Sequence, residues 1–126
     1  MILGAVTRDG REAAIDLVLR GPPGGDETIR AVIDTGFDGS LTVESGLVAR
    51  LGLLRRGRQR GVLADSQAVG LEVYEAIVEW DGRTRRVLAS LTQGAPLVGM
   101  ALLRGYELTV QVTPDGPVRL TPLALP

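Results

Sequence analysis

Short stretches in which apolar and polar residues alternate, each ended by a turn rich in glycine or proline, recur along the chain. The clearest is 13–20, where Ile15, Leu17 and Leu19 share one face. A period of two is typical of a β-strand that buries one face. The stretch ends at Gly-Pro-Pro-Gly-Gly-Asp, 21–26, a strong turn signal, and another strand pattern follows, which predicts a hairpin. This succession of short strand patterns and turns favours an all-β fold over one built on helices.

The same pattern predicts where the other elements lie. Further strands are expected at 28–33, 40–43, 61–64, 68–80, 83–91, 96–99, 106–113 and 118–121. A short helix is expected at 45–51, with Ser45 as N-cap and Gly52 as its end, and a second at 101–104. We therefore expect a single domain, 1–126, with a closed barrel-like sheet and one or two short helices.

Three residue types that carry much of enzyme chemistry are missing. The chain contains no histidine, no cysteine and no lysine. That excludes Ser-His-Asp and Cys-His catalysis, zinc held by His or Cys, a P-loop lysine and Schiff-base chemistry. Any catalysis must therefore rest on carboxylates, hydroxyls, arginines, tyrosines or a metal held by oxygen.

The charge balance gives no sign of a nucleic-acid or membrane partner. The net charge is −1, and the one local basic run is Arg55, Arg56, Arg58 and Arg60. It lacks the interleaved aromatic residues of a nucleic-acid platform, so we expect a solvated loop there. The sequence shows neither a secretory signal nor an apolar stretch of transmembrane length, and we expect a cytoplasmic protein.

The segment 31–36 is the strongest candidate for chemistry. An apolar, largely β-branched run delivers Asp34, Thr35 and Gly36 into a turn, and a new strand follows soon after. An acid that activates water needs a rigid support, a hydrogen bond and an open face, and these three residues supply the last two at the end of a strand. The same three residues are also ordinary turn formers, so a purely structural turn stays open at this point.

In context the segment resembles a known family. Ile33-Asp34-Thr35-Gly36 followed by Ser40-Leu41-Thr42-Val43 resembles the active-site strand and loop of retropepsin-like aspartic peptidases, in wording closest to small bacterial and archaeal members. Leu97-Val98-Gly99 before 101–104 matches that family's second motif, two hydrophobic residues and a glycine ahead of a helix. The predicted hairpin between the motifs stands where the family has its flap.

The resemblance implies a role for each matching residue. Asp34 would be the catalytic aspartate, Thr35 would lock two active-site loops together, and Gly36 would contact substrate. Substrate contacts are also expected from Phe37, Asp38, Ala64, Asp65, Ser66, Gln67, Val98 and Gly99. The chain departs from the family at Phe37, at the flap tip 65–67, and at Met100 and Ala101, where viral relatives have Arg and Asn or Asp.

The resemblance also implies a mechanism. One motif per chain implies a homodimer in which two Asp34 carboxylates activate water to cleave a peptide or unfolded protein, without metal or organic cofactor. The main alternative is a non-catalytic binding or regulatory module with the same fold. A phosphate-handling protein is a weaker alternative, because the chain lacks lysine and a helical pattern.

Overall fold

A computed structural model describes residues 1–62 and 68–124. These residues form ten strands and two short helices. The strands are β1 (Ile2–Val6), β2 (Ala13–Arg20), β3 (Asp26–Ile33), β4 (Leu41–Val43), β5 (Leu54–Val62), β6 (Ala68–Trp80), β7 (Arg83–Leu91), β8 (Leu97–Val98), β9 (Tyr106–Val110) and β10 (Pro117–Pro122). The helices are α1 (Ser45–Leu51) and α2 (Met100–Leu103). No helix in these ranges is long and apolar enough to cross a membrane.

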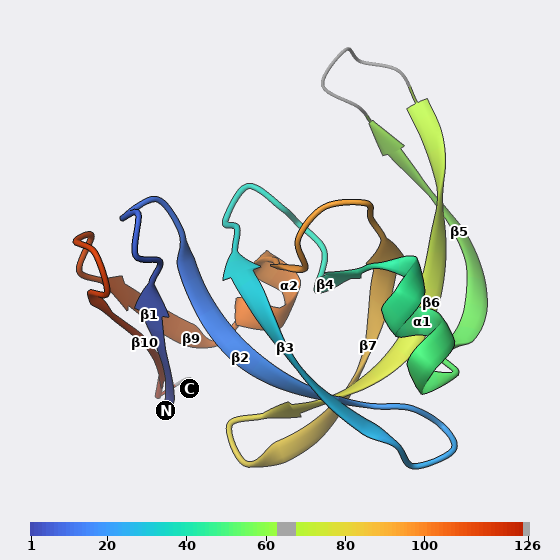
Figure 1. The fold of residues 1–126 in the computed structure, drawn as a ribbon, viewed down its shortest axis with the longest axis horizontal. Coiled ribbons are helices and arrows are strands. Elements are labelled where there is room, and N and C mark those ends of the chain that lie inside the picture. The colour runs from blue at the N-terminus through green and yellow to red at the C-terminus, as the bar shows by residue number, and fades with distance from the viewer. Residues whose placement is uncertain (63–67, 125–126) are drawn as a thin grey trace.

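Six of the strands close into a barrel. The ring runs β2–β3–β8–β4–β7–β6, and pairing of β6 with β2 joins its two ends (Figure 1). β5 continues the sheet beyond β6, and the β5–β6 hairpin projects from the side of the barrel where β3 ends (Figure 1). The expected all-β closed barrel with one or two short helices is confirmed.

Alternate residues of the barrel strands form the core. Leu17 and Leu19 of β2 and Val78 and Trp80 of β6 are among its most buried side chains. Removing such apolar surface from water is the main term that stabilises a domain of this size. Helix α1 adds Leu47 and Leu51 to the same cluster, so the barrel and α1 share one core.

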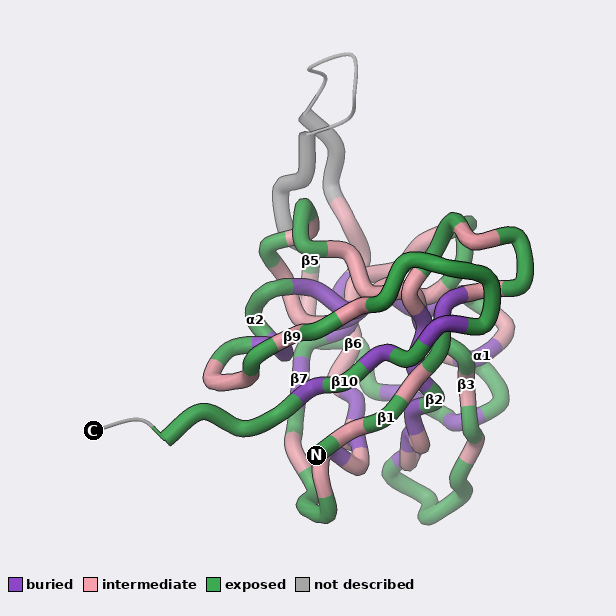
Figure 2. The backbone as a smooth tube through the Cα atoms, turned by 90° about the vertical axis from the view of Figure 1, so that its left-hand side faces the viewer, coloured by how far each residue is buried: buried purple, intermediate pink, exposed green. Residues whose placement is uncertain are grey.

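A small terminal sheet packs beside the barrel. β1, which the sequence reading did not predict, pairs with β2 and β10, and β10 also pairs with β9. Buried and exposed positions alternate along β10, so one face of this sheet joins the core (Figure 2). Tyr106 links β9 to the barrel, because its ring packs edge-on against Trp80 at 5.7 Å and its hydroxyl donates to Asp81 Oδ2 at 2.9 Å. Tyr106 therefore connects the terminal sheet to the barrel.

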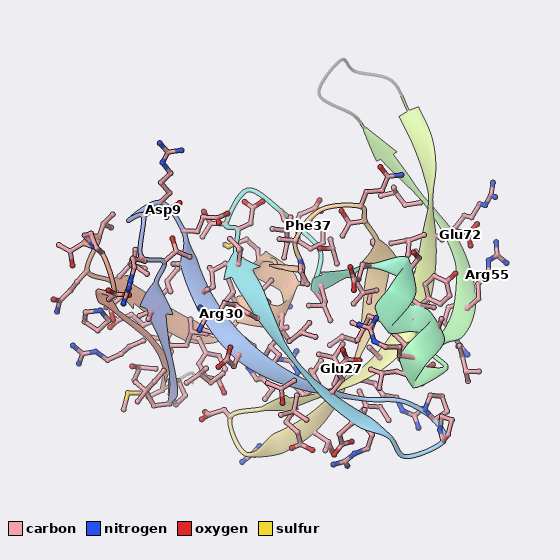
Figure 3. All side chains as sticks on the ribbon, viewed as in Figure 1. Asp9, Glu27, Arg30, Phe37, Arg55 and Glu72 are labelled. Atoms are coloured by element: carbon pink, nitrogen blue, oxygen red, sulfur yellow. The ribbon has the colours of Figure 1, made fainter. Side chains whose placement is uncertain are left out.

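The described arginines of the cluster are exposed to solvent, as expected, but they lie on a strand and not in a loop. β5 begins at Leu54, so Arg55, Arg56 and Arg58 face the neighbouring β6. Arg55 and Arg58 both bond Glu72, the latter at 2.9 Å, as Figure 3 shows for Arg55 and Glu72. Arg56 pairs with Glu75. The strand was expected only from residue 61, because charged side chains, rather than alternating apolar ones, are matched across its first part.

Helix α1 begins and ends close to where the sequence indicates. Gly52 ends it in the left-handed conformation at φ 65°, as expected. The N-cap, however, is Glu44 and not Ser45, and no side chain caps the first turn. Helix α2 begins at Met100, one residue earlier than expected.

We expect Tyr106→Phe to lower stability and to remove part of its alkaline dependence. Burial and the bond to Asp81 raise the pKa of Tyr106. The folded state therefore keeps a proton that the unfolded chain loses near pH 10, and stability falls as pH rises through the native pKa. At neutral pH the lost bond should cost about 1–2 kcal/mol. Denaturant unfolding of both proteins from neutral to alkaline pH measures this, and equal alkaline slopes would contradict it.

Candidate active site

Asp34 follows the last residue of β3, where a neighbouring strand holds the backbone. β8 runs parallel to β3, with Ile33 opposite Val98. The Asp34 amide donates to the Val98 carbonyl at 2.9 Å, and the Val32 amide donates to Pro96 at 2.9 Å. The backbone of Asp34 is thus fixed by the sheet although its side chain lies beyond the strand.

The Asp34 carboxylate sits in a tight turn. The side-chain Oδ1 of Asp34 accepts the Gly36 amide at 2.9 Å, and the backbone carbonyl of Asp34 accepts the Phe37 amide at 3.1 Å. An aspartate that bonds the amide two residues on is a common turn device. The carboxylate is half-buried, whereas Thr35 and Gly36 are exposed. The turn therefore orients the acid and leaves a face open.

The surroundings of Gly36 show how open that face is. A Cβ added at Gly36 would meet one described atom within 4 Å, Asp34 Oδ1 at 3.2 Å. Among the described residues no hydrogen bond engages the Thr35 hydroxyl. The turn thus presents the carboxylate and a hydroxyl toward space that another molecule can enter.

Val98 and Gly99 lie beneath the turn. Both are buried, and the Gly99 amide donates to the Ser40 carbonyl at 3.0 Å. A Cβ at Gly99 would lie 2.2 Å from the Gly39 carbonyl oxygen, so a glycine is required there by packing. In the single chain these two residues support the loop, and their expected contact with substrate stays a prediction.

The remaining expected site residues divide into two groups. Phe37 and Asp38 lie in the loop between β3 and β4; Asp38 is exposed, while Phe37 is half-buried. Ala64, Asp65, Ser66 and Gln67 lie outside the described residues. The structure therefore brings Asp34 to Asp38 together with Val98 and Gly99, and the assignment of the flap tip stays a prediction.

Thr42 is a site-supporting residue that sequence reasoning missed. It is buried in β4, and its Oγ1 accepts the Leu97 amide at 2.8 Å. The bond joins β4 to β8, the strand whose Val98 carbonyl accepts the Asp34 amide. A hydroxyl between two apolar residues of a short strand was the available signal, because a buried polar group needs a partner.

A pocket of about 320 Å³ lies beside the turn. Its lining runs from Thr35 through Met100 of α2 to Tyr106 and Leu108 of β9. The half-exposed Met100 contributes apolar surface. The exposed turn is therefore continuous with a partly apolar surface on α2 and β9.

The acidic residues of β6 are engaged by arginines. Glu72 bonds Arg55 and Arg58, which lower its pKa. Glu75 pairs with Arg56 and Arg86, and Glu79 with Arg20. In the described ranges no group of three or more acidic side chains converges as metal ligands would. These glutamates form surface ion pairs along the strand.

A solved structure supports the family resemblance at the level of fold. The crystal structure of a retropepsin-like aspartic protease from Rickettsia conorii matches 98% of this chain and 91% of that chain, with a TM-score of 0.55. The fold is retropepsin-like. The two sequences are 17% identical, and no protein-family model or curated protein sequence matches the chain. Asp34 lies in this barrel at the start of a loop next to β8.

We expect Thr42→Val to destabilise the loop support. Valine keeps the shape of threonine but leaves the half-buried Leu97 amide without its acceptor, which should cost about 1–2 kcal/mol. Thr28→Val makes the same change at an exposed position of β3 and serves as the control. Chemical denaturation of the three proteins measures the difference. An equal fall in the free energy of unfolding in the two variants would show that the Thr42 hydrogen bond does not stabilise the loop.

Proposed function

We propose that the chain is an aspartic endopeptidase that acts as a homodimer, with Asp34-Thr35-Gly36 supplying half of the site. The observation that carries the proposal is the Asp34 carboxylate, oriented by Gly36 in an open turn of a retropepsin-like barrel. The absence of histidine, cysteine and lysine from the sequence leaves carboxylates as the best available acid and base.

The proposed chemistry needs two copies of Asp34. Two carboxylates about 3 Å apart do not both ionise readily, so the pair shares a proton. The ionised member takes a proton from water, and the protonated member polarises the carbonyl of the peptide bond. The two apparent pKa values belong to the pair. Thr35 would bond the partner's loop, and the expected flap, 63–70 with its tip at 65–67, would cover the bound peptide.

The free edge of β9 supports a specific mode of pairing. Both edges of β1 and of β10 are used within the chain, whereas the described strands leave one edge of β9 open. Gln111 donates to the Pro117 carbonyl across the β9–β10 pair. By alternation, Tyr106, Leu108 and Val110 direct their backbone groups to the open edge. We place the partner subunit there, beside the pocket that joins β9 to Thr35.

A non-catalytic binding module is the second candidate. The observation that favours it is that the Asp34 turn is complete within one chain, with the Gly36 amide on Oδ1. A turn of this kind needs no catalytic role to explain its aspartate. The two candidates differ in what the carboxylate does, which a single substitution tests.

Asp34→Asn is expected to abolish peptide cleavage while keeping the fold. The asparagine Oδ1 still accepts the Gly36 amide, but the amide does not take a proton from water. Stability of the dimer should hold or rise, because one source of carboxylate repulsion is removed. Asp16→Asn, an exposed aspartate of β2, is the matched control and should retain activity. Cleavage of fluorescently labelled casein between about pH 4 and pH 7, with melting curves, gives both readouts.

The outcomes separate the candidates. Activity of the parent protein should be highest at mildly acidic pH, where the pair carries one proton. Equal cleavage by the parent and by Asp34→Asn would exclude the peptidase. If neither protein cleaves the substrate, the binding module becomes the better account.

Met100→Glu is expected to weaken the dimer. Met100 is 50% exposed and shares the pocket with Thr35 and Leu108, so pairing at β9 would bury the new charge. We expect Kd to rise about tenfold or more. Leu88→Glu, at a site that is 48% exposed on β7, makes a comparable change away from β9. Sedimentation of both variants measures Kd. A fully active monomer of the parent protein would contradict the dimer.

A further inference from the structure

The ring of Phe37 packs onto its own chain, against two glycines of the site. A Cβ added at Gly39 would lie 2.6 Å from Phe37 Cζ, and one added at Gly99 would lie 2.5 Å from Phe37 Cδ2. The ring therefore occupies the space that side chains at those positions would fill. Figure 3 marks Phe37 in the loop that follows β3.

The backbone of Phe37 joins the same two parts of the site. Its amide donates to the Asp34 carbonyl at 3.1 Å, which closes the turn around the carboxylate. Its carbonyl accepts the Met100 amide at 2.8 Å, at the first residue of α2. The Gly39 carbonyl accepts the Ala101 amide at 3.1 Å. Phe37 is thus bonded to the Asp34 turn on one side and to α2 on the other.

We propose that Phe37 is a positioning residue for Asp34, and that its ring clamps the loop exit onto the β8–α2 junction. The inference deepens the proposed function, since it takes Asp34 as the reacting carboxylate. Two residues, Thr35 and Gly36, separate Phe37 from Asp34 in the sequence, and the Phe37 amide closes the turn that contains them. Loss of the ring would let the turn shift, and a shift of about 1 Å is enough to cost about 100-fold in rate.

The glycines are selected for space and not for an unusual backbone. Neither Gly39 nor Gly99 has a positive φ. The three atoms nearest to a Gly39 Cβ all belong to the Phe37 ring, whereas a Gly99 Cβ would also meet the Gly39 carbonyl oxygen at 2.2 Å. Removing the ring should therefore make room for alanine at position 39 but not at position 99.

Amide hydrogen exchange tests the clamp without relying on activity. Phe37→Ala should speed exchange of the Gly36 and Met100 amides by about tenfold or more, because their hydrogen bonds open locally. The Leu17 amide in the barrel is the internal control and should be unchanged. Phe37→Leu, which keeps a bulky apolar group, should restore most of the protection. Unchanged exchange at Gly36 and Met100 in Phe37→Ala would overturn the proposal.

A double-mutant cycle tests the fit of ring and glycine. Gly39→Ala alone should lower the melting temperature, and Gly39→Ala combined with Phe37→Ala should melt no lower than Phe37→Ala alone. Gly99→Ala should not be relieved by Phe37→Ala. Simple additivity of the Gly39 and Phe37 effects would count against the clamp.

Kinetics connect the clamp to the proposed reaction. On labelled casein, Phe37→Ala should lower kcat about 100-fold with little change in KM, and Phe37→Leu should recover most of it. A rise in KM alone would assign Phe37 to substrate binding and overturn the positioning role. If the parent protein cleaves nothing, the proposed function fails, while the exchange and melting results still decide whether Phe37 holds the Asp34 turn.

Discussion

The parallel pairing of β3 with β8 is the contact on which the site depends. It ties the Asp34 amide to the Val98 carbonyl, so the chain leaves the sheet at a fixed point and must turn at once. Thr42 reinforces the pairing from β4, and Gly99 lets the returning loop come close enough to bond α2. Asp34 is half-buried beside the exposed Gly36, whereas Thr42, Val98 and Gly99, which hold the loop from below, are buried. General acid–base chemistry requires a carboxylate that substrate can reach and a rigid backbone that holds it.

A second set of contacts joins the terminal sheet to the barrel. Tyr106 brings the ring of Trp80 and the carboxylate of Asp81 into one cluster, and it also lies beside the pocket next to Thr35. The same residue therefore stabilises the fold and helps to shape the surface that we assign to the partner subunit. In the proposed dimer, the stability of the fold and the pairing of subunits would therefore both depend on β9.

Residues with a clear local pattern were predictable from the sequence. The strand 13–20 and the helix that ends at Gly52 depend on alternation and on a left-handed glycine, which are local properties. β5 was placed too late, because its arginines are matched by glutamates on another strand. For the candidate site, the order of residues pointed to Asp34, and the structure places this residue in a turn at the end of β3. The packing of the Phe37 ring against Gly99 was not predictable, because Gly99 approaches from a segment that is distant in the sequence.

The two free edges of the described sheet are unlike, and this has a consequence for growth of the assembly. β5 carries Arg55, Arg56 and Arg58 along its length, and such charges keep another strand from adding. β9 has no comparable row of like charges. If copies join only through β9, each copy has one edge strand that can pair with another copy. Pairing of two copies then uses both of these edges. The complex then ends at a pair, because the β5 edges that stay free carry charges that oppose the addition of another strand.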